Sequence, residues 1–173
     1  MNPIDELITA SEFREAMAQL PSAVSVVTSD GRAGRCGITA SSVCSVTDDP
    51  PTVLVCINRS SRSTAIIKAN GVVAINLLNS AQHRIAQSFS SRTDRSIEER
   101  FSDPAWQTGA SGAPCLAQAL MSIQGAVAQV HEVGTHSVFI VNVQHAVVDG
   151  RHSPTLYFRR AYAELVASEI GPA

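Results

Sequence analysis

Short runs of apolar and β-branched residues, each closed by turn-forming residues, restrict the folds open to this chain. Runs of this length and composition are typical of β-strands, and turns such as Asp149-Gly150 favour hairpins and antiparallel pairing. Antiparallel strands in a domain of this size close into a barrel, because closure removes the exposed edges. We therefore expect a mainly β fold, a compact barrel, with strands at 23–28, 36–46, 52–57, 72–78, 117–133, 137–148 and 154–158.

Two of these expectations concern neighbouring segments. The runs at 23–28 and 36–46 are expected to pair with each other as one hairpin, because Ser29-Asp30-Gly31 lies between them. Residues 161–166 either extend the last strand or begin a tail, and the sequence leaves both open.

Capping patterns add helices at the periphery of the sheet. Thr9 and Glu12 have the spacing of a capping box, and Ser96 and Glu99 repeat it. Glycines and prolines between 103 and 114 predict a loop that Trp106 anchors. We expect helices at 11–20, 61–69 and 80–89, and another that begins near 96.

Charge and cysteine content exclude several classes of protein. The 173 residues fit one domain, 1–173, and only 16% are charged, which indicates that part of the surface is covered in an oligomer. The net charge of −2, without a basic run, argues against nucleic-acid binding. No apolar stretch suits a membrane helix or a signal peptide. The four cysteines form no CxxC pair, which is typical of reduced thiols, and we expect a cytoplasmic protein.

Small polar residues interrupt the apolar pattern in the segment 37–46. A strand of this kind leaves space beside its backbone, where a flat ring could use the hydroxyls of Thr39, Ser41 and Ser42 together with peptide groups. Residue types alone leave open that this is an ordinary strand facing solvent.

The next strand ends at Asn58, directly before a predicted helix N-terminus with Arg59 and Arg62 beside it. Free N–H groups, the positive end of the helix dipole and two guanidiniums suit a phosphate. Ring and phosphate sites on neighbouring strands are what a flavin nucleotide requires, although an ordinary helix cap has the same composition. Two other arginine pairs, at 92 and 95 and at 159 and 160, also suit a phosphate-bearing ligand.

The order of these segments resembles that of a known family. The sequence is similar to the short-chain flavin reductases of two-component aromatic monooxygenases, such as the reductase partners of 4-hydroxyphenylacetate and chlorophenol hydroxylases. The matching pieces cover almost the whole chain: 13–17, 23–28, Gly37-Ile-Thr-Ala-Ser-Ser-Val-Cys-Ser-Val46, 50–63, 70–78, 100–101, Trp106, Gly134-Thr-His136 and 154–157.

The resemblance implies an antiparallel Greek-key fold, a flavin-binding split β-barrel with peripheral helices, and a homodimer. It implies that Thr39, Ala40, Ser41 and Ser42 lie beside the isoalloxazine ring. It assigns the flavin phosphate to the segment that holds Asn58, Arg59, Ser61, Ser63 and Thr64, and it assigns Phe89 and Ser90 to the flavin or the nicotinamide. Cys56 is expected among the cofactor-binding residues.

Two further motifs concern the nicotinamide side. Gly134-Thr135-His136 resembles a Gly-Asp-His motif whose histidine faces the flavin and nicotinamide, with Thr135 in place of the acid. His136 is thereby implied as the catalytic residue, in a positioning and electrostatic role. Arg159, Arg160 or Tyr162, in the tail motif, is implied to help close the nicotinamide pocket.

The function implied is transfer of hydride from NADH to FAD or FMN, with reduced flavin supplied to a separate monooxygenase. No GxGxxG follows a strand, so NADH is expected to bind on the flavin domain itself. Reduction of another acceptor, or oxidation of a pyridoxamine-type amine, is an alternative on the same fold. A non-catalytic flavin-binding electron carrier or sensor is another. His131, Glu132 and His136 match no standard ligand spacing, so we expect no metal site.

Overall fold

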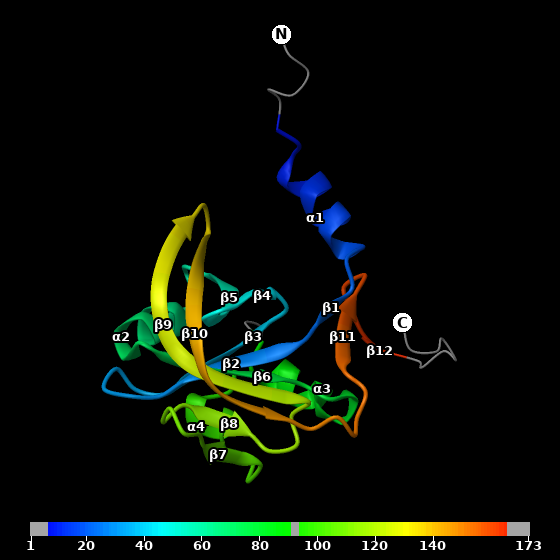
Figure 1. Ribbon diagram of the computed structural model, residues 1–173. Helices are drawn as coiled ribbons and strands as arrows, with labels where there is room; N and C mark the ends of the chain where they lie inside the picture. Colours follow the sequence, from blue (N-terminus) through cyan, green and yellow to red (C-terminus); the bar gives the residue numbers. More distant parts are fainter. Residues whose placement is uncertain (1–6, 91–93, 166–173) are drawn as a thin grey trace.

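A curved seven-stranded antiparallel sheet forms the body of the molecule. The computed structural model describes residues 7–90 and 94–165 (Figure 1). Every neighbouring pair in the sheet is antiparallel, which confirms the mainly β fold expected from the sequence. In spatial order the strands are β3 (Cys36–Ala40), β2 (Ser25–Ser29), β6 (Val72–Leu77), β9 (Met121–Val133), β10 (His136–Val148), β5 (Pro51–Asn58) and β4 (Val43–Asp48).

The two edge strands, β3 and β4, follow each other directly in sequence. Ser41 and Ser42 join them, and the chain crosses from one edge of the sheet to the other at this point. Ser42 already pairs on the β4 side and continues the β4–β5 register: the Cys56 N–H donates to its carbonyl at 3.1 Å, and its hydroxyl donates to the Cys56 carbonyl at 2.9 Å. We call residues 41–42 the seam.

The prediction of one strand at 36–46 is therefore wrong. Only 36–40 pairs with β2, whereas 43–48 pairs with β5 on the opposite edge. No ladder among the described residues joins β3 to β4, so the sheet is a split barrel and not the closed one that strand counting favoured.

β9 and β10 form a long, bent hairpin of 13 residues on each side (Figure 1). Two register shifts, between Ile140 and Val141 and between Val143 and His145, accompany the bend. Gly125 permits the close approach, because a Cβ there would stand 2.1 Å from the Asn142 carbonyl oxygen. The predicted strand at 117–133 begins only at Met121, since 114–116 belongs to a separate hairpin.

That separate hairpin occupies the stretch predicted as a loop. It consists of β7 (Trp106–Thr108) and β8 (Pro114–Leu116). Another small sheet joins β1 (Ser22–Ala23), β11 (Thr155–Phe158) and β12 (Ala161–Glu164). β12 resolves the alternatives for the segment after 160: the chain turns back at Arg159 and Arg160, both at positive φ, and pairs with β11. Residues 166–173 lie outside the described part.

The helices begin where the capping patterns place them. α1 (Ala10–Ala18) and α4 (Ile97–Arg100) have complete capping boxes, at Thr9 and at Ser96. Ser61 caps α2 (Arg62–Asn70), and Gly71 ends it at a φ of 70°. The predicted helix 80–89 is a 3₁₀ turn, η1 (Ser80–Gln82), followed by α3 (His83–Ser88), and Asn79 provides the cap. None of the helices in residues 7–90 and 94–165 is long and apolar enough to cross a membrane.

The core consists of two clusters. The first fills the curved sheet beneath α2 and includes Val55, Ile67, Ile75 and Phe139. The second lies between the sheet and the lower layer of α3, α4, β7 and β8 that Figure 1 shows. Its centre is an edge-to-face triad of Phe89, Phe101 and Trp106, with ring centroids 4.9 to 5.3 Å apart.

Candidate functional site

A cavity of about 780 Å³ opens where β3, the end of β5, the start of α2 and the region of α3 and α4 meet. It brings together most of the residues that the sequence nominated. Its lining includes Thr39, Ala40, Ser41, Ser42, Cys56, Asn58, Ser61, Ser63, Phe89, Ser90 and His136. Arg59, Thr64, Arg159 and Tyr162 do not line it.

One side of this cavity, which we call the strand wall, consists of residues 37–42 and 56–58. Most of its side chains are small, and some of its hydroxyl groups donate hydrogen bonds to backbone carbonyls of the protein. Thr39 Oγ1 donates to the Ala86 carbonyl at 2.6 Å, and the Thr39 N–H donates to the Phe89 carbonyl at 3.0 Å. With Ser42 Oγ donating to Cys56, these hydroxyls offer a ligand lone pairs and not protons.

Phe89 supports the strand wall from behind. Its side chain is 1% exposed, and its ring packs against Phe101 and Trp106. A Cβ at Gly37 would lie 2.5 Å from the Phe89 ring, so only glycine fits opposite it. Ser90, which follows, donates its hydroxyl to the Gln87 carbonyl at 2.9 Å.

The N-terminus of α2 faces the cavity through Ser60, Ser61, Arg62 and Ser63. Asn58 Oδ1 accepts from the Ser60 N–H and hydroxyl, and Ser61 Oγ accepts from the Ser63 N–H. Thr64 is buried behind this turn and donates to the Asn58 carbonyl at 2.7 Å. These bonds hold the first turn of α2 in place with its positive dipole end directed at the cavity.

Four arginines line the cavity, and no Asp or Glu stands among its described lining residues. We call Arg35, Arg62, Arg95 and Arg100 the charged wall. Arg35 is also paired with Asp30 at 2.7 Å, and its guanidinium lies 5.5 Å from the centre of the Phe101 ring. Arg100 Nε donates to the Arg95 carbonyl at 3.0 Å. The arrangement favours an anionic ligand.

Sequence reasoning found part of the charged wall. The pair of arginines at 92 and 95 pointed to Arg95, although Arg92 lies outside the described residues. Arg35 and three residues at α4, Ser96, Ile97 and Arg100, were missed as site residues, because they lie outside the two segments that the ring and phosphate patterns marked.

Arg59 holds the β9–β10 turn. Its Nε lies 2.9 Å from Glu132 Oε2, its Nη1 donates to the Gly134 carbonyl at 3.2 Å, and its N–H donates to the Thr135 carbonyl at 2.9 Å. Glu132 also accepts from Lys68 at 2.5 Å and from Ser137. The hydrogen bond from Lys68, with smaller contributions from Ser137 and Arg59, lowers the pKa of this exposed carboxyl.

His136 begins β10 and pairs with Asn58 of β5, which brings its side chain to the edge of the cavity. Its Nδ1 lies 2.9 Å from Thr135 Oγ1. Gly134 makes the turn before it at a φ of 52°.

A second cavity of about 420 Å³ adjoins the first and shares Thr39, Ser41 and Ser90 with it. Tyr162 and Tyr157 line it from the β11–β12 hairpin, with ring centroids 5.7 Å apart. Burial raises the pKa of the Tyr162 hydroxyl. The described lining also includes Val24, Gln87 and Arg160.

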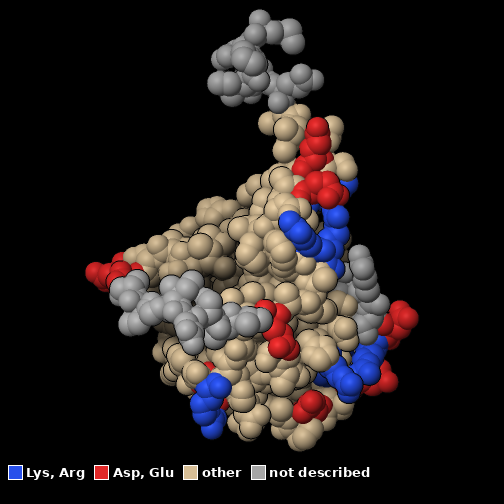
Figure 2. All heavy atoms as spheres, turned by 90° about the vertical axis from the view of Figure 1, so that its right-hand side faces the viewer, with Lys and Arg blue, Asp and Glu red and all other residues tan. Residues whose placement is uncertain are grey.

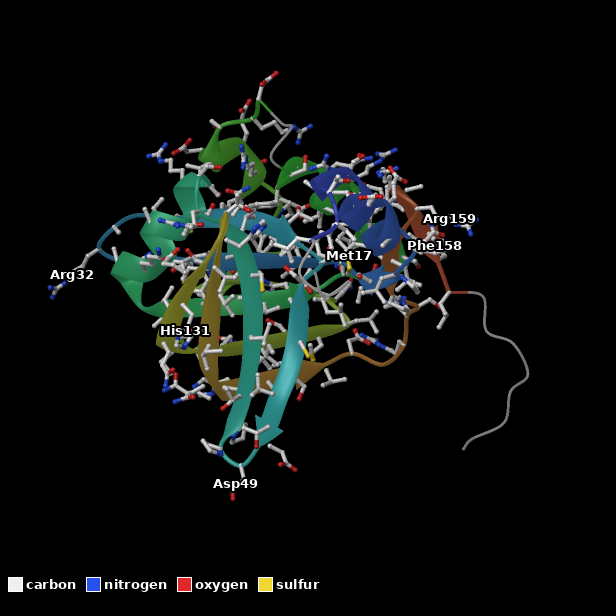
Figure 3. The ribbon with its side chains drawn as sticks, turned by 90° about the horizontal axis from the view of Figure 1, so that it is seen from above. Met17, Arg32, Asp49, His131, Phe158 and Arg159 are labelled. Carbon is white, nitrogen blue, oxygen red and sulfur yellow. The ribbon has the colours of Figure 1, made fainter. Side chains whose placement is uncertain are left out.

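Arg159 lines neither cavity. Its Nε donates to Gln19 Oε1 at 3.0 Å, and its guanidinium lies 5.0 Å from the centre of the Phe158 ring. Figure 3 shows Arg159 and Phe158 together at the C-terminal hairpin.

Known proteins share both the sequence and the fold. Residues 17–166 match the model of the flavin reductase like domain. The chain is 45% identical over 150 residues to the 4-hydroxyphenylacetate 3-monooxygenase reductase component of Salmonella typhi, covering 87% of this chain and 88% of that one. It is 47% identical over 161 residues to an FMN reductase (NADH) of Methylorubrum extorquens, covering 92% of each.

A solved structure agrees with these relatives. The NADH:FAD oxidoreductase of Streptomyces globisporus C-1027, in complex with NAD and FAD fragments, superposes with a TM-score of 0.85 at 26% identity. The match covers 96% of this chain and 99% of that one. The family resemblance and the fold class expected from the sequence are confirmed, and the chain belongs to the flavin reductase like domain family.

Proposed function

We propose that this protein is an NADH-dependent flavin reductase that transfers hydride from NADH to FAD or FMN and supplies the reduced flavin to a partner aromatic monooxygenase. The observation that carries this proposal is the cavity itself. A space of about 780 Å³ has small residues on one side and four arginines with a helix N-terminus on the other. It falls within the size range of small-molecule sites, roughly 300–1,000 Å³.

The residues fit the two ends of a flavin nucleotide. The strand wall offers a flat, uncharged surface with peptide groups and hydroxyl lone pairs for the isoalloxazine ring, at Thr39, Ala40, Ser41 and Ser42. The first turn of α2 offers N–H groups, and Arg62 offers an always-charged guanidinium, to the phosphate. No carboxylate among the described lining residues would repel that phosphate.

Flavin, when bound, supplies the hydride-accepting ring, and the residues of the chain orient the two reactants. The strand wall covers one face of the ring and excludes water from it. The adjoining cavity, lined by Tyr162 and Arg160 among others, would hold the nicotinamide nucleotide next to the flavin. His136 stands at the edge of the main cavity, where its imidazole positions the nicotinamide or favours charge on the reduced ring. Contact distance and alignment are the main requirement.

The protein acts as a single-domain homodimer in the cytoplasm, and its reduced flavin passes to a separate monooxygenase. Exposed apolar side chains support the homodimer: Phe13, Met17 and Leu20 of the α1 region are each more than 40% exposed. Figure 2 shows charged side chains gathered over α1 and scattered below it, with broad uncharged surface between them. Apolar and uncharged surface of this kind suits association with a second copy.

The test mixes purified protein and NADH with excess FMN or FAD, in separate reactions, and follows the loss of NADH absorbance. We expect oxidation that scales with the added flavin, and NADPH in parallel reports the preference for the nicotinamide. Tight flavin binding without turnover would contradict the proposal and favour an electron carrier or sensor. The reduced flavin is then offered to an aromatic monooxygenase held in a separate chamber.

A further inference from the structure

Thr135 and His136 form a side-chain pair in a turn that other residues hold rigid. Arg59 binds the carbonyls of Gly134 and Thr135, and Glu132 holds the guanidinium of Arg59. The backbone at 134–135 is therefore fixed from outside the pair. Thr135 Oγ1 stands 2.9 Å from His136 Nδ1, and both residues are exposed.

The hydroxyl of Thr135 makes no other side-chain hydrogen bond within residues 7–90 and 94–165. This contact joins a hydroxyl, which can donate or accept, to a ring nitrogen whose role depends on the tautomer. A neutral imidazole carries one N–H, and the nitrogen that accepts a hydrogen bond cannot be the one that carries the hydrogen. If Thr135 donates to Nδ1, the hydrogen of the neutral ring is on Nε2.

We propose that the Thr135 hydroxyl donates to Nδ1 and that Thr135 is thereby a positioning residue that sets the tautomer of His136, so that Nε2–H is offered to the cavity as a hydrogen-bond donor. The ligand atom it meets is an acceptor, a carbonyl oxygen, ring nitrogen or phosphate oxygen of the flavin or nicotinamide nucleotide. This assignment rests on the proposed function for the identity of the ligand, but not for the tautomer.

A hydroxyl and a carboxylate at position 135 would act differently. A carboxylate only accepts, so it would draw the ring hydrogen to Nδ1 and leave Nε2 of the neutral ring as an acceptor. The threonine hydroxyl donates to the neutral ring and accepts from the protonated ring. Nε2–H therefore stays available in both charge states of His136.

The experiment compares wild type with Thr135→Val, which keeps the shape and removes the hydroxyl, and with Thr135→Ser, which keeps the hydroxyl. A third substitution, Thr135→Asp, introduces the acceptor. Nitrogen-15 NMR of histidine-labelled protein reports the tautomer of the neutral imidazole, and loss of one signal set in His136→Gln assigns it. Because Thr135 is exposed, these variants are expected to fold, and thermal unfolding checks this.

We expect the Nε2–H tautomer in wild type and in Thr135→Ser, a mixture in Thr135→Val, and the Nδ1–H tautomer in Thr135→Asp. For NADH-dependent flavin reduction we expect kcat to fall about three- to tenfold in Thr135→Val, the effect of one hydrogen bond, with flavin Kd unchanged and with recovery in Thr135→Ser.

An Nδ1–H tautomer in wild type, or one tautomer in all variants, would overturn the proposal. An unchanged kcat in a variant whose tautomer has changed would overturn its role in the reaction. Wild-type protein that binds flavin but does not oxidise NADH would instead refute the proposed function, and the NMR measurement would still decide the tautomer.

Discussion

The strand wall and the charged wall enclose the same cavity but are built in opposite ways. The strand wall is fixed by hydrogen bonds inside the protein and by Phe89, which is 1% exposed. The charged wall consists of four arginines from three separate segments, since Arg95 lies just before α4 and Arg100 ends it. Arg35 and Arg62 stand exposed at its rim. One wall therefore provides shape at the expense of free hydrogen-bond donors, and the other provides charge without contributing to the core. Substitutions in the first should affect stability, and those in the second should affect ligand affinity.

The largest expected effect is on the support of the strand wall. Phe89→Ala removes a fully buried ring from the triad with Phe101 and Trp106, and we expect the free energy of unfolding to fall by about 3–5 kcal/mol. Urea unfolding measures it. Gln87→Ala, an exposed position on α3, is the matched control and should stay within about 0.5 kcal/mol of wild type. A loss below about 1 kcal/mol for Phe89→Ala would show that the triad does not hold this wall.

The next effect is on affinity. Arg62→Ala removes a guanidinium from the cavity, and we expect flavin binding to weaken about tenfold or more, as for a lost charge-assisted hydrogen bond. Stability should not change. Arg32→Ala is the control, because Arg32 points away from the body in Figure 3. Fluorescence titration of FMN at low and high salt gives Kd, and the difference from wild type should narrow at high salt. An equal loss of flavin affinity in both variants would show that the arginines attract flavin through a general electrostatic field and not through contact in the cavity.

A smaller effect on stability tests the hydroxyls of the strand wall. Thr39→Val keeps the shape and removes the donor to the Ala86 carbonyl, which should cost about 1 kcal/mol of unfolding free energy. Thr108→Val, at an exposed position in β7, provides the comparison and should change little. If Thr39→Val instead weakened flavin binding strongly at unchanged stability, its hydroxyl would serve the ligand and not the wall.

The smallest effect concerns the β9–β10 turn, which belongs to neither wall. Glu132 has a pKa below its ordinary value of 4.5, chiefly because Lys68 donates to it. A lowered folded-state pKa contributes stability above pH 4.5, and this contribution is lost as the pH falls through the folded-state value. Thermal unfolding of wild type and Glu132→Gln should show a small difference in stability at neutral pH, about what exposed ion pairs give, and this difference should narrow as the pH falls below 4.5. A difference in stability that does not change with acid would contradict this origin.

The parts of the fold that follow from local chemistry were predictable. Thr9 with Glu12 and Ser96 with Glu99 mark real helix starts, and the apolar run at 52–57 lies within β5. The seam at Ser41-Ser42 was not predictable, because nothing in a run of small strand-forming residues shows that the partner changes from β2 to β5. Only the curvature of the whole sheet decides this.

The candidate site divides in the same way. Residues of one continuous segment, such as 39–42, were found together, whereas Arg35 and Arg100 come from distant segments and had no local signature. Arg59 and Arg62 look equivalent in sequence. The turn held by Asn58 separates them, so that Arg62 lines the cavity and Arg59 binds Glu132.

The seam has a consequence for the order in which the chain folds. The β9–β10 hairpin joins neighbours in sequence and needs only local loop closure, as does β4 with β5. The bonds between Ser42 and Cys56 continue the β4–β5 pairing and are local too. The cavity also needs the long-range pairings of β2 with β6 and of β6 with β9, and it needs β3 beside α2, where the Ser63 hydroxyl donates to the Gly37 carbonyl at 3.2 Å. High contact order of this kind slows folding, and we expect the cavity to be completed in the last, rate-limiting stage. A nascent chain released before that stage would contain most of its hairpins and no place for a nucleotide.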